Sequence, residues 1–450
     1  MSAGAQGASG VSGKDSRKFG FWMASALVVG NVIGAGLFLL PATLAPYGWD
    51  SVAGWLITLG GALCLAWVFA QLSRYLPHAG GAFGFMRLAH GDGPAFVGAW
   101  GYWVSIWVAN AAIATGAISY LSRLVPSVES TAGVAPILTC GVIWLLTWVN
   151  LRGVRTVGWV QMGTTSVKLL PFVAVLALII LRLAAEGTSA VAPFDAGALT
   201  LGGATAAATL TFYSLTGLES AAIPADRVED PARTVPAATM FGTWLTGIVS
   251  LVCCSAVVLM LPSAEVAGSA APFALFIGRA WGDWAAAFVA LCAVVSCYGA
   301  LNGWVLLAGE LPAAMADAGR LPAWFGVRNA RGAPLSAVLL SSVLTSVLVL
   351  LNFTSSMAAV FTFAILLATA TNLVLYLFCA VGAVRLMRSG AVPHSPMLLG
   401  AAVGATVFSV WALYGAGRQA LVWGMVLLLA GWPVFIVAAR ARTATARSSP

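Results

Sequence analysis

Long apolar runs follow one another through most of the chain and are separated by short polar loops. A membrane-spanning helix needs about 20 apolar residues, and by that measure the pattern predicts twelve spans. They are expected at 20–46, 52–73, 95–124, 133–151, 157–183, 200–224, 237–261, 284–310, 334–353, 357–384, 396–415 and 419–439. The pattern therefore predicts an all-α integral membrane protein with twelve transmembrane helices.

The first apolar run has small and polar residues at its centre, where a lipid-facing helix has no need for them. Gly30, Asn31, Gly34 and Gly36 lie there. Each glycine weakens a helix by roughly 1 kcal/mol relative to alanine, and an asparagine amide needs hydrogen-bond partners in hydrocarbon. Irregular backbone at that depth is tolerated where it is buried in protein or lines a cavity. Span 20–46 is therefore predicted to be a broken helix at a transporter binding site.

The sixth span repeats this feature, because Thr216, Gly217 and Glu219 interrupt its apolar run. Two interrupted spans, five helices apart, predict a five-plus-five inverted repeat. The first repeat would cover 19–185, the inverted repeat 200–388, and helices 11 and 12 would lie at 396–440. All three parts would belong to one transporter domain, 19–440.

Charge is scarce and unevenly placed. Only 8% of residues are charged and 60% are hydrophobic, whereas soluble domains carry about 25% charge. Of the 22 Lys and Arg residues, seventeen fall in alternate loops and tails, and four fall in the loops between them. The positive-inside rule then places both termini in the cytoplasm. Residues 1–18 show no signal-peptide pattern and are predicted to be a disordered cytoplasmic tail, and 441–450 a second cytoplasmic tail.

These features favour a protein of the cell (inner or plasma) membrane. The net charge of +8 does not indicate a nucleic-acid partner, since the basic residues sit in short loops between spans. The seven cysteines lie in apolar segments, and His78, His90 and His394 are expected in loops. None of these shows metal-ligand spacing, so no metal or other cofactor is predicted.

Three motifs together resemble the amino acid–polyamine–organocation (APC) superfamily of transporters. They are Gly30 to Phe38 followed by Leu39-Leu40-Pro41-Ala42, Tyr213 to Ser220 followed by Val228 to Pro236, and Ala308-Gly309 through Asp317 to Pro322. The most similar subgroup is the basic amino acid/polyamine antiporters, of which arginine/agmatine antiporters are typical. The resemblance implies a LeuT-like fold with broken helices 1 and 6, transport by alternating access, and often a homodimer in the lipid membrane.

The resemblance also implies a substrate site at the two breaks. At the first, free amide groups would hold the substrate carboxylate, and a helix amino terminus would add a favourable dipole. The residues concerned are Asn31, Val32, Ile33, Gly34, Ala35 and Gly36. Ala35 replaces a serine of the antiporters, so one hydroxyl is lost. The alternative is that the glycines serve close helix packing.

At the second break, Thr216 and Gly217 would expose carbonyl groups to the substrate ammonium. Tyr213 stands where the antiporters have a gating tryptophan; ordinary core packing is the alternative. Further substrate contacts are expected on span 3 and span 8, at Ser105, Ile106, Asn110 and Trp304. Ile106 and Ile113 replace a cysteine and a methionine, and Leu366 stands where a serine is expected. The pocket would thus be less polar than in the antiporters.

Two charged residues, Glu219 and Lys168, lie near mid-depth of their spans, where such groups are rare and functional by default. Glu219 is expected to couple or gate transport, with a structural hydrogen bond as the alternative; Tyr102 is assigned to the same role. Lys168 lies near the middle of span 5, where an ammonium costs roughly 2.5–3.5 kcal/mol on insertion scales. Proton-coupled APC transporters carry a lysine there and arginine/agmatine antiporters do not. Glu310 is expected to be a solvated cap or loop partner.

The leading hypothesis is a secondary active transporter that exchanges cationic amino acids or polyamines, or is proton-coupled. The alternatives are a neutral amino-acid/proton symporter, a broad amino-acid exchanger, and an amino-acid sensor that does not transport. A channel would need a repeated filter motif, and a membrane enzyme would need clustered acids or histidines at one interface. Neither pattern occurs, so no enzymatic activity is predicted.

Overall fold

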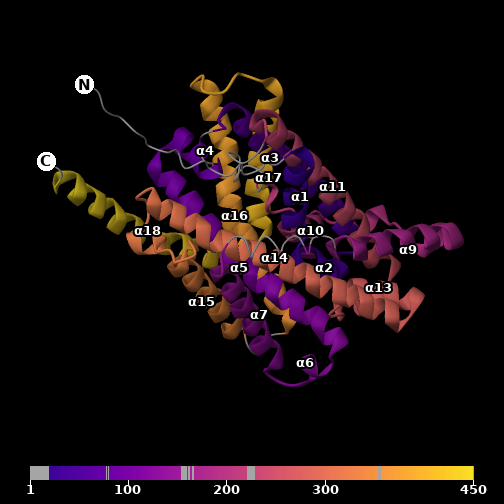
Figure 1. The fold of residues 1–450 in the computed structure, drawn as a ribbon. Helices are drawn as coiled ribbons and strands as arrows, with labels where there is room; N and C mark the ends of the chain where they lie inside the picture. Colours follow the sequence, from indigo (N-terminus) through magenta and orange to yellow (C-terminus); the bar gives the residue numbers. More distant parts are fainter. Residues whose placement is uncertain are drawn as a thin grey trace, which may run out of the picture.

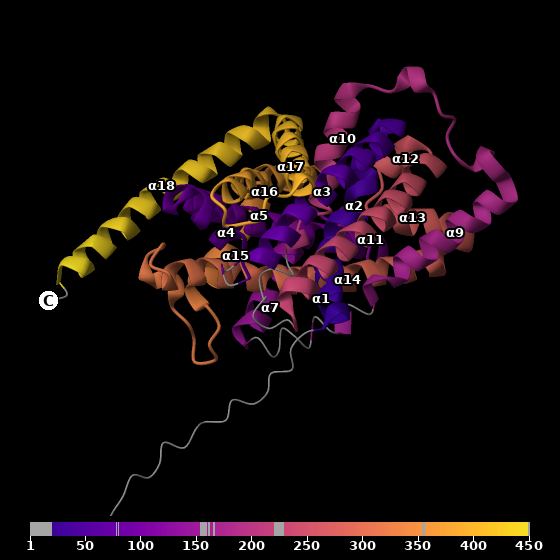
Figure 2. The same ribbon diagram turned by 90° about the horizontal axis from the view of Figure 1, so that it is seen from above.

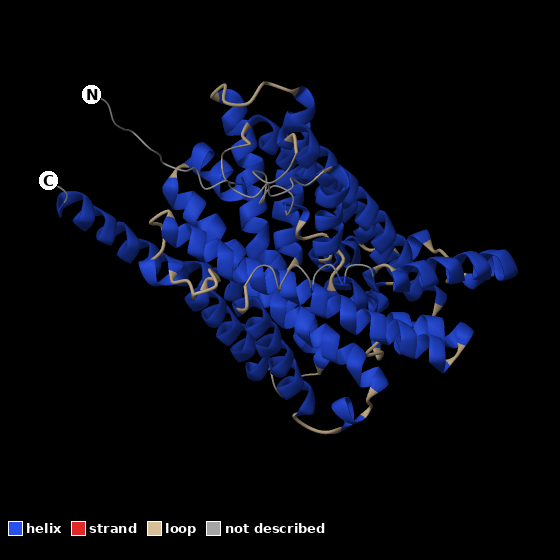
Figure 3. Ribbon diagram, in the orientation of Figure 1, coloured by secondary structure: helices blue, strands red, loops and turns tan. Residues whose placement is uncertain are grey.

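A computed structural model of the chain describes residues 20–448, apart from 78, 80, 154–159, 161–162, 165–166, 220–228 and 353–355. Helices make up nearly all of this part, and the one β-type pairing in it is an isolated bridge between Arg328 and Pro334. Figure 3 shows helices joined by short loops. The prediction of an all-α membrane protein is confirmed for the residues described.

The long helices follow the predicted spans closely. The elements are α1 (Phe21–Val32), α2 (Ala35–Leu44), η1 (Ala45–Tyr47), α3 (Trp49–Tyr75), α4 (Gly81–His90), α5 (Asp92–Leu124), α6 (Ser127–Ser130), α7 (Val134–Leu151), α9 (Leu170–Glu186), η2 (Gly187–Ala190), η3 (Ala196–Ala198), α10 (Leu201–Tyr213), α11 (Pro231–Met260), α12 (Ser263–Ala267), α13 (Pro272–Trp281), α14 (Asp283–Asp317), η6 (Ala323–Gly326), α15 (Leu335–Leu351), α16 (Met357–Arg388), α17 (Pro396–Gly415) and α18 (Gly417–Ser448).

Nine helices of the described part are long and apolar enough to cross a membrane. The other three predicted spans fall on the α1–α2 pair, on α10 and on α15, which are interrupted or shorter. The chain is therefore a multi-pass membrane protein, whereas the count of twelve spans stays a prediction. The first part of span 5, from 157 to 169, lies largely outside the described residues.

The helices pack in two groups that meet at α16. In one group α3 contacts both α10 and α11, and α11 contacts α1; in the other α5 contacts α14, α7 and α15. Helix α16 packs along α5 and also against α10 and α2. Most side chains of α5 are buried, so this helix forms the centre of the bundle. Figures 1 and 2 show α18 projecting beyond the bundle, and its helix continues through most of the predicted tail 441–450.

The carboxyl-terminal half of α14 contains a proline that its neighbours accommodate. Pro312 has no N–H to donate to the carbonyl of Ala308, four residues earlier. That carbonyl instead accepts hydrogen bonds from Trp103 Nε1 on α5 and Ser341 Oγ on α15, each at 3.1 Å. A proline kink usually needs such substitute donors, and here they bind α14 to both neighbouring helices.

Candidate functional site

The first predicted break is present. Helix α1 ends at Val32, Ile33 and Gly34 leave the helical conformation, and α2 begins at Ala35. Gly34 is extended, with φ −125° and ψ −167°. The first N–H groups of a helix have no acceptor within it, so the start of α2 offers donors and a partial positive charge at this break. The Leu37 N–H is already bonded, to the Gly34 carbonyl at 3.2 Å. Val32, Ile33, Gly34 and Gly36 are buried, and Asn31 is partly buried.

The glycines at this break also allow close packing. A Cβ atom at Gly36 would lie 2.5 Å from Cε1 of Tyr213, and one at Gly34 would lie 3.2 Å from the Cβ of Ala300 on α14. The ring of Tyr213 therefore lies directly against Gly36. The break brings the end of α10 and the middle of α14 against the start of α2, as the neighbouring positions of these helices in Figure 1 show. Both glycines thus lie in close contact with neighbouring helices, while a substrate role for the break stays a prediction.

The structure describes the first side of the second predicted break. Helix α10 ends at Tyr213, and the backbone N–H groups of residues 214–216 bond three residues back, as in a tighter 3₁₀ turn. Gly217 has φ +99°, a conformation that favours glycine. The Thr216 hydroxyl donates to the Tyr213 carbonyl at 2.7 Å and so stays within its own turn. The last residues predicted for this span, from Ser220 to 224, lie outside the described part.

Glu219 is buried directly after this break, with 1% of its surface exposed. Its carboxylate accepts hydrogen bonds from the hydroxyl groups of Tyr102 on α5 and Tyr376 on α16, each at 2.5 Å. Buried carboxylates are stable only when paired or hydrogen-bonded. Glu219 therefore joins the end of α10 to both of the central helices α5 and α16.

One face of α5 passes beside the second break. Tyr213 donates its hydroxyl to the Ala109 carbonyl at 3.4 Å, which places the next residue, Asn110, beside the same region. Asn110 is 2% exposed, and its Oδ1 atom has no hydrogen-bond partner among the described residues. A buried polar atom without a partner is costly, so this oxygen is a candidate acceptor for a ligand. The Ser105 hydroxyl is occupied, since it donates to the Tyr102 carbonyl at 2.7 Å.

Lys168 contacts the first break. Its ammonium nitrogen donates to the carbonyl oxygen of Gly30 at 2.8 Å, and only 1% of Lys168 is exposed. Gly30 lies in the last turn of α1, where carbonyl groups carry the negative end of the helix dipole. The Lys168 ammonium therefore does not extend to the membrane surface in this structure.

The aromatic wall predicted at Trp304 lies on the same helix as Ala300, one turn further along α14. Residues four apart share a helical face, so Trp304 is on the face of α14 that meets the first break. Trp304 is buried, with 6% of its surface exposed. Leu366 instead lines a separate cavity of about 730 Å³ between α2, α10, α16 and the turn before α18.

A second cavity, of about 330 Å³, reaches Glu219. Its walls come from α4, α5, α14 and α16, and Tyr102 and Ile106 line it beside Glu219. From there it extends along α14 past Glu310 toward Ala318. Two of the residues predicted to couple or gate transport, Tyr102 and Glu219, thus share one cavity with the predicted substrate contact Ile106.

Tyr376 was not predicted from the sequence. The available signal was its rarity, because the chain has only eight tyrosines and this one lies in the middle of an apolar run. The prediction that His90 lies in a loop is wrong: His90 is the last residue of α4. Its Nε2 is 2.8 Å from the Phe378 carbonyl oxygen, and its Nδ1 is 2.7 Å from Nη1 of Arg385. His78 lies outside the described residues.

Comparison with known proteins agrees with this arrangement. The family model for amino acid permeases matches residues 19–437. The putrescine transporter PotE of Haemophilus influenzae is 30% identical over 424 residues, which cover 93% of this chain and 97% of that protein. PotE of Escherichia coli K12 is 29% identical over 427 residues, covering 93% and 96%.

The cadaverine/lysine antiporter of Escherichia coli K12 is 33% identical over 348 residues, which are 76% of this chain and 76% of that protein. The family match extends over both break regions and over the buried Glu219 and Lys168. The chain therefore belongs to the amino acid permease family, within the APC superfamily of membrane transporters.

Proposed function

We propose that this protein is a secondary active exchanger of cationic amino acids and polyamines that works by alternating access. The observation that carries the proposal is the meeting of the two broken helices, with the ring of Tyr213 seated on Gly36. In this proposal the chain crosses the cell inner membrane twelve times, as a five-plus-five inverted repeat with both termini in the cytoplasm. A homodimer is the proposed assembly.

The geometry supports a division of labour between the breaks. The free N–H groups at the start of α2 suit a carboxylate. The end of α10 offers backbone carbonyl groups, which suit an ammonium. Asn110 Oδ1 adds a buried acceptor without a partner among the described residues. Tyr213 and Trp304 supply aromatic faces, which attract a cationic side chain.

The relatives support the cationic class of cargo. Two of them are named for putrescine and one for cadaverine and lysine, which are amines or carry a side-chain amine. Glu219 supplies the only acidic side chain found at the described part of the two breaks, where it would favour a cation. The proposed chemistry is binding and release only, as befits a transporter rather than an enzyme.

A proton-coupled carrier of neutral amino acids is the second candidate, and one contact favours it. Lys168 places a titratable ammonium on the Gly30 carbonyl, at the negative end of α1. A lysine that gains and loses a proton there would alter the break itself. The apolar side chain of Ile106 beside Glu219 also suits a neutral cargo.

Purified protein in liposomes distinguishes these functions. The liposomes are tested with labelled lysine, arginine, putrescine, cadaverine and leucine, with and without internal substrate and with and without a pH gradient. We expect uptake of the cationic compounds that internal lysine or putrescine stimulates. Leucine uptake driven by the gradient alone would support the second candidate. Binding without flux would contradict both and indicate a sensor.

A further inference from the structure

The cavity that reaches Glu219 has one more charged residue in its wall. One face of α14 and the residue after it line the cavity with Leu307, Glu310, Leu311, Ala314, Met315 and Ala318. Glu310 and Ala314, and Ala314 and Ala318, are four residues apart and so share that face. The described residues of the wall include two carboxylates, Glu219 and Glu310, and no basic residue. A cation in this cavity would therefore meet two acidic groups at different places along it, Glu310 and Glu219.

Glu310 lies on the route between the predicted site and the end of α14. Trp304 precedes it by six residues, which is about 9 Å along a helix axis. The positive-inside rule places this end of α14 in the cytoplasm. Glu310 therefore lies between the predicted site and the cytoplasmic end of α14, and it shares the cavity wall with Glu219.

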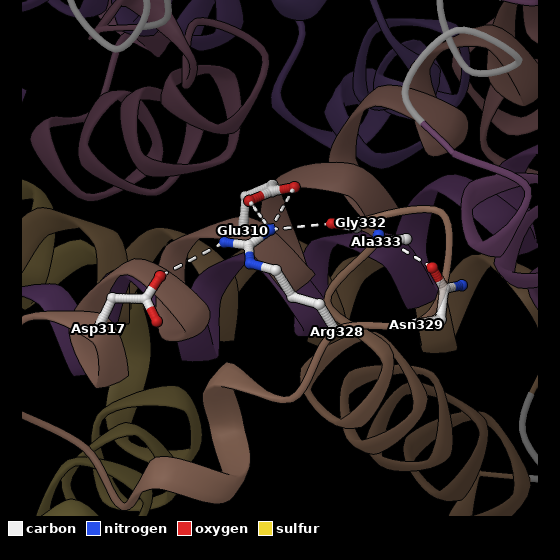
Figure 4. Close-up of polar contacts among 6 residues, drawn as sticks. All are labelled: Glu310, Asp317, Arg328, Asn329, Gly332 and Ala333. Atoms are coloured by element: carbon white, nitrogen blue, oxygen red, sulfur yellow. Dashed lines mark hydrogen bonds and ion pairs between the residues drawn. The ribbon is translucent and has the colours of Figure 1, made fainter. Parts of the chain in front are cut away.

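The carboxylate of Glu310 is already paired with a cationic side chain of the protein, Arg328. Arg328 Nη1 lies 3.2 Å from Oε2 of Glu310, and Arg328 Nη2 lies 3.5 Å from Oδ2 of Asp317. Figure 4 shows the Arg328 guanidinium between these two carboxylates. Burial of Arg328 opposes its charge, yet Glu310 and Asp317 raise the pKa of Arg328 above its ordinary value. The guanidinium thus stays charged wherever the pair is formed.

The loop that carries Arg328 is organised by its own hydrogen bonds. Asn329 Oδ1 accepts from the N–H groups of Arg331 and Ala333 at 2.9 and 3.1 Å, and Gly332 has φ +78°. Arg328 Nη1 also donates to the Gly332 carbonyl at 3.1 Å. The loop therefore keeps its shape without Glu310, and the guanidinium retains a partner when it leaves the carboxylate.

The ion pair between Arg328 and Glu310 has the features of a weak pair that another cation can displace. Strong charge-assisted hydrogen bonds are about 2.7–2.9 Å long, whereas the Arg328–Glu310 contacts are 3.2 and 3.5 Å. Both side chains are about one-third exposed, at 36% and 34%. Exposed pairs of this kind contribute little to stability, so a substrate cation can displace the guanidinium at small cost.

We propose that Glu310 is the cytoplasmic receiving site for the ammonium group of a cationic substrate, and that Arg328 is the counter-ion which the substrate displaces. This inference rests on the proposed function. It adds to that function a residue, Glu310, that acts only when substrate enters from the cytoplasmic face of the membrane. A diamine entering from the cytoplasm would bind Glu310 first and then pass along α14 toward Glu219. Asp317 holds Arg328 but does not line the cavity, so it provides a matched control.

The test measures putrescine exchange at each face separately. Everted membrane vesicles expose the cytoplasmic face and intact cells expose the outer face. For Glu310→Gln we expect the half-saturating putrescine concentration at the cytoplasmic face to rise about tenfold, since a contact to a charged group is lost. At the outer face it should stay within twofold, which also shows that the variant folds. Asp317→Asn should stay within twofold at both faces.

Arg328→Gln should lower the half-saturating concentration at the cytoplasmic face by up to about fivefold, because Glu310 is then unoccupied. Three results would overturn the inference: no change in Glu310→Gln, equal changes in Glu310→Gln and Asp317→Asn, or a Glu310→Gln effect of the same size at both faces. If the unaltered protein exchanges no cationic compound at either face, the proposed function itself is wrong.

Discussion

The ammonium nitrogen of Lys168 donates a 2.8 Å hydrogen bond to the carbonyl oxygen of Gly30, and the contact is buried. It joins the helix of span 5 to the last turn of α1. A helix carboxyl terminus carries roughly half a negative charge, so the lysine neutralises the end of the first half-helix. We therefore expect that a loss of the Lys168 charge would weaken this contact at the break.

Two substitutions of Lys168 can distinguish the effect of its positive charge from the effect of its ability to release a proton. Arginine is not deprotonated in proteins, so Lys168→Arg should retain substrate exchange and lose accumulation driven by a pH gradient. Lys168→Ala should lose both, because the carbonyl at the break then lacks its partner. Labelled substrate uptake into liposomes with an imposed gradient measures this. Full gradient-driven accumulation in either variant would refute a coupling role for Lys168.

Removing the Tyr376 hydroxyl, which donates to Glu219, should weaken the contact between the residues after α10 and helix α16. Tyr376→Phe leaves the carboxylate with the Tyr102 hydrogen bond, and the loss of a hydrogen bond to a charged group costs about 1.5–3 kcal/mol. We expect a lower unfolding temperature in detergent and slower exchange. Tyr414→Phe is the control, because Tyr414 is exposed on α17. Equal unfolding temperatures for both variants would show that the Tyr376 contact is unimportant.

The two glycines of the first break should differ in their tolerance of a methyl group. Gly36→Ala would drive Cβ to 2.5 Å from the Tyr213 ring, whereas Gly34→Ala meets Ala300 Cβ at 3.2 Å. We expect Gly36→Ala to abolish substrate exchange and Gly34→Ala to reduce it. Adding Ala300→Gly should restore the Gly34→Ala variant, since it removes the opposing methyl group. A failure of that rescue would argue against the observed contact.

Asn110 should matter more for binding than for stability. Its Oδ1 atom has no partner among the described residues, so Asn110→Ala removes no hydrogen bond from that oxygen. We expect the unfolding temperature to change by only a few degrees and the half-saturating substrate concentration to rise about tenfold. Isothermal binding and thermal unfolding on the same preparation measure both. A large loss of stability with unchanged binding would make Asn110 a packing residue.

The apolar runs predicted the helices well, because a hydrocarbon environment leaves the backbone little choice but to form helices. Glycine and polar residues at mid-span predicted a break in both spans. The structure has the first at Ile33–Gly34, and it ends α10 at Tyr213, where the second is predicted. The family resemblance named Glu219 and Lys168, and burial of both agrees with it. Their roles in coupling stay predictions.

The partners of these residues could not be predicted, since they come from helices distant in the sequence. Tyr376 is 157 residues from Glu219, and Gly30 is 138 residues from Lys168. Which turn of α16 faces the end of α10 depends on packing, which hydrophobicity alone does not specify. The contact between Arg328 and Glu310 could not be predicted for a similar reason, because it depends on the shape of the loop that carries Arg328.

The proline in α14 has a mechanical consequence for the cavity. Trp103 and Ser341 hold the Ala308 carbonyl from α5 and α15, only two residues before Glu310. The α14 backbone is therefore held from both sides next to Pro312, and we expect the α14 wall of the cavity to be rigid. On the opposite wall, α4 and α16 are joined to each other through His90 and the Phe378 carbonyl, but neither bonds to α14 among the contacts described. A change in the width of the passage should therefore come from movement of α4 and α16 as a pair. The substrate would then pass the carboxylate of Glu310, which stays in place on α14, while α4 and α16 move outward.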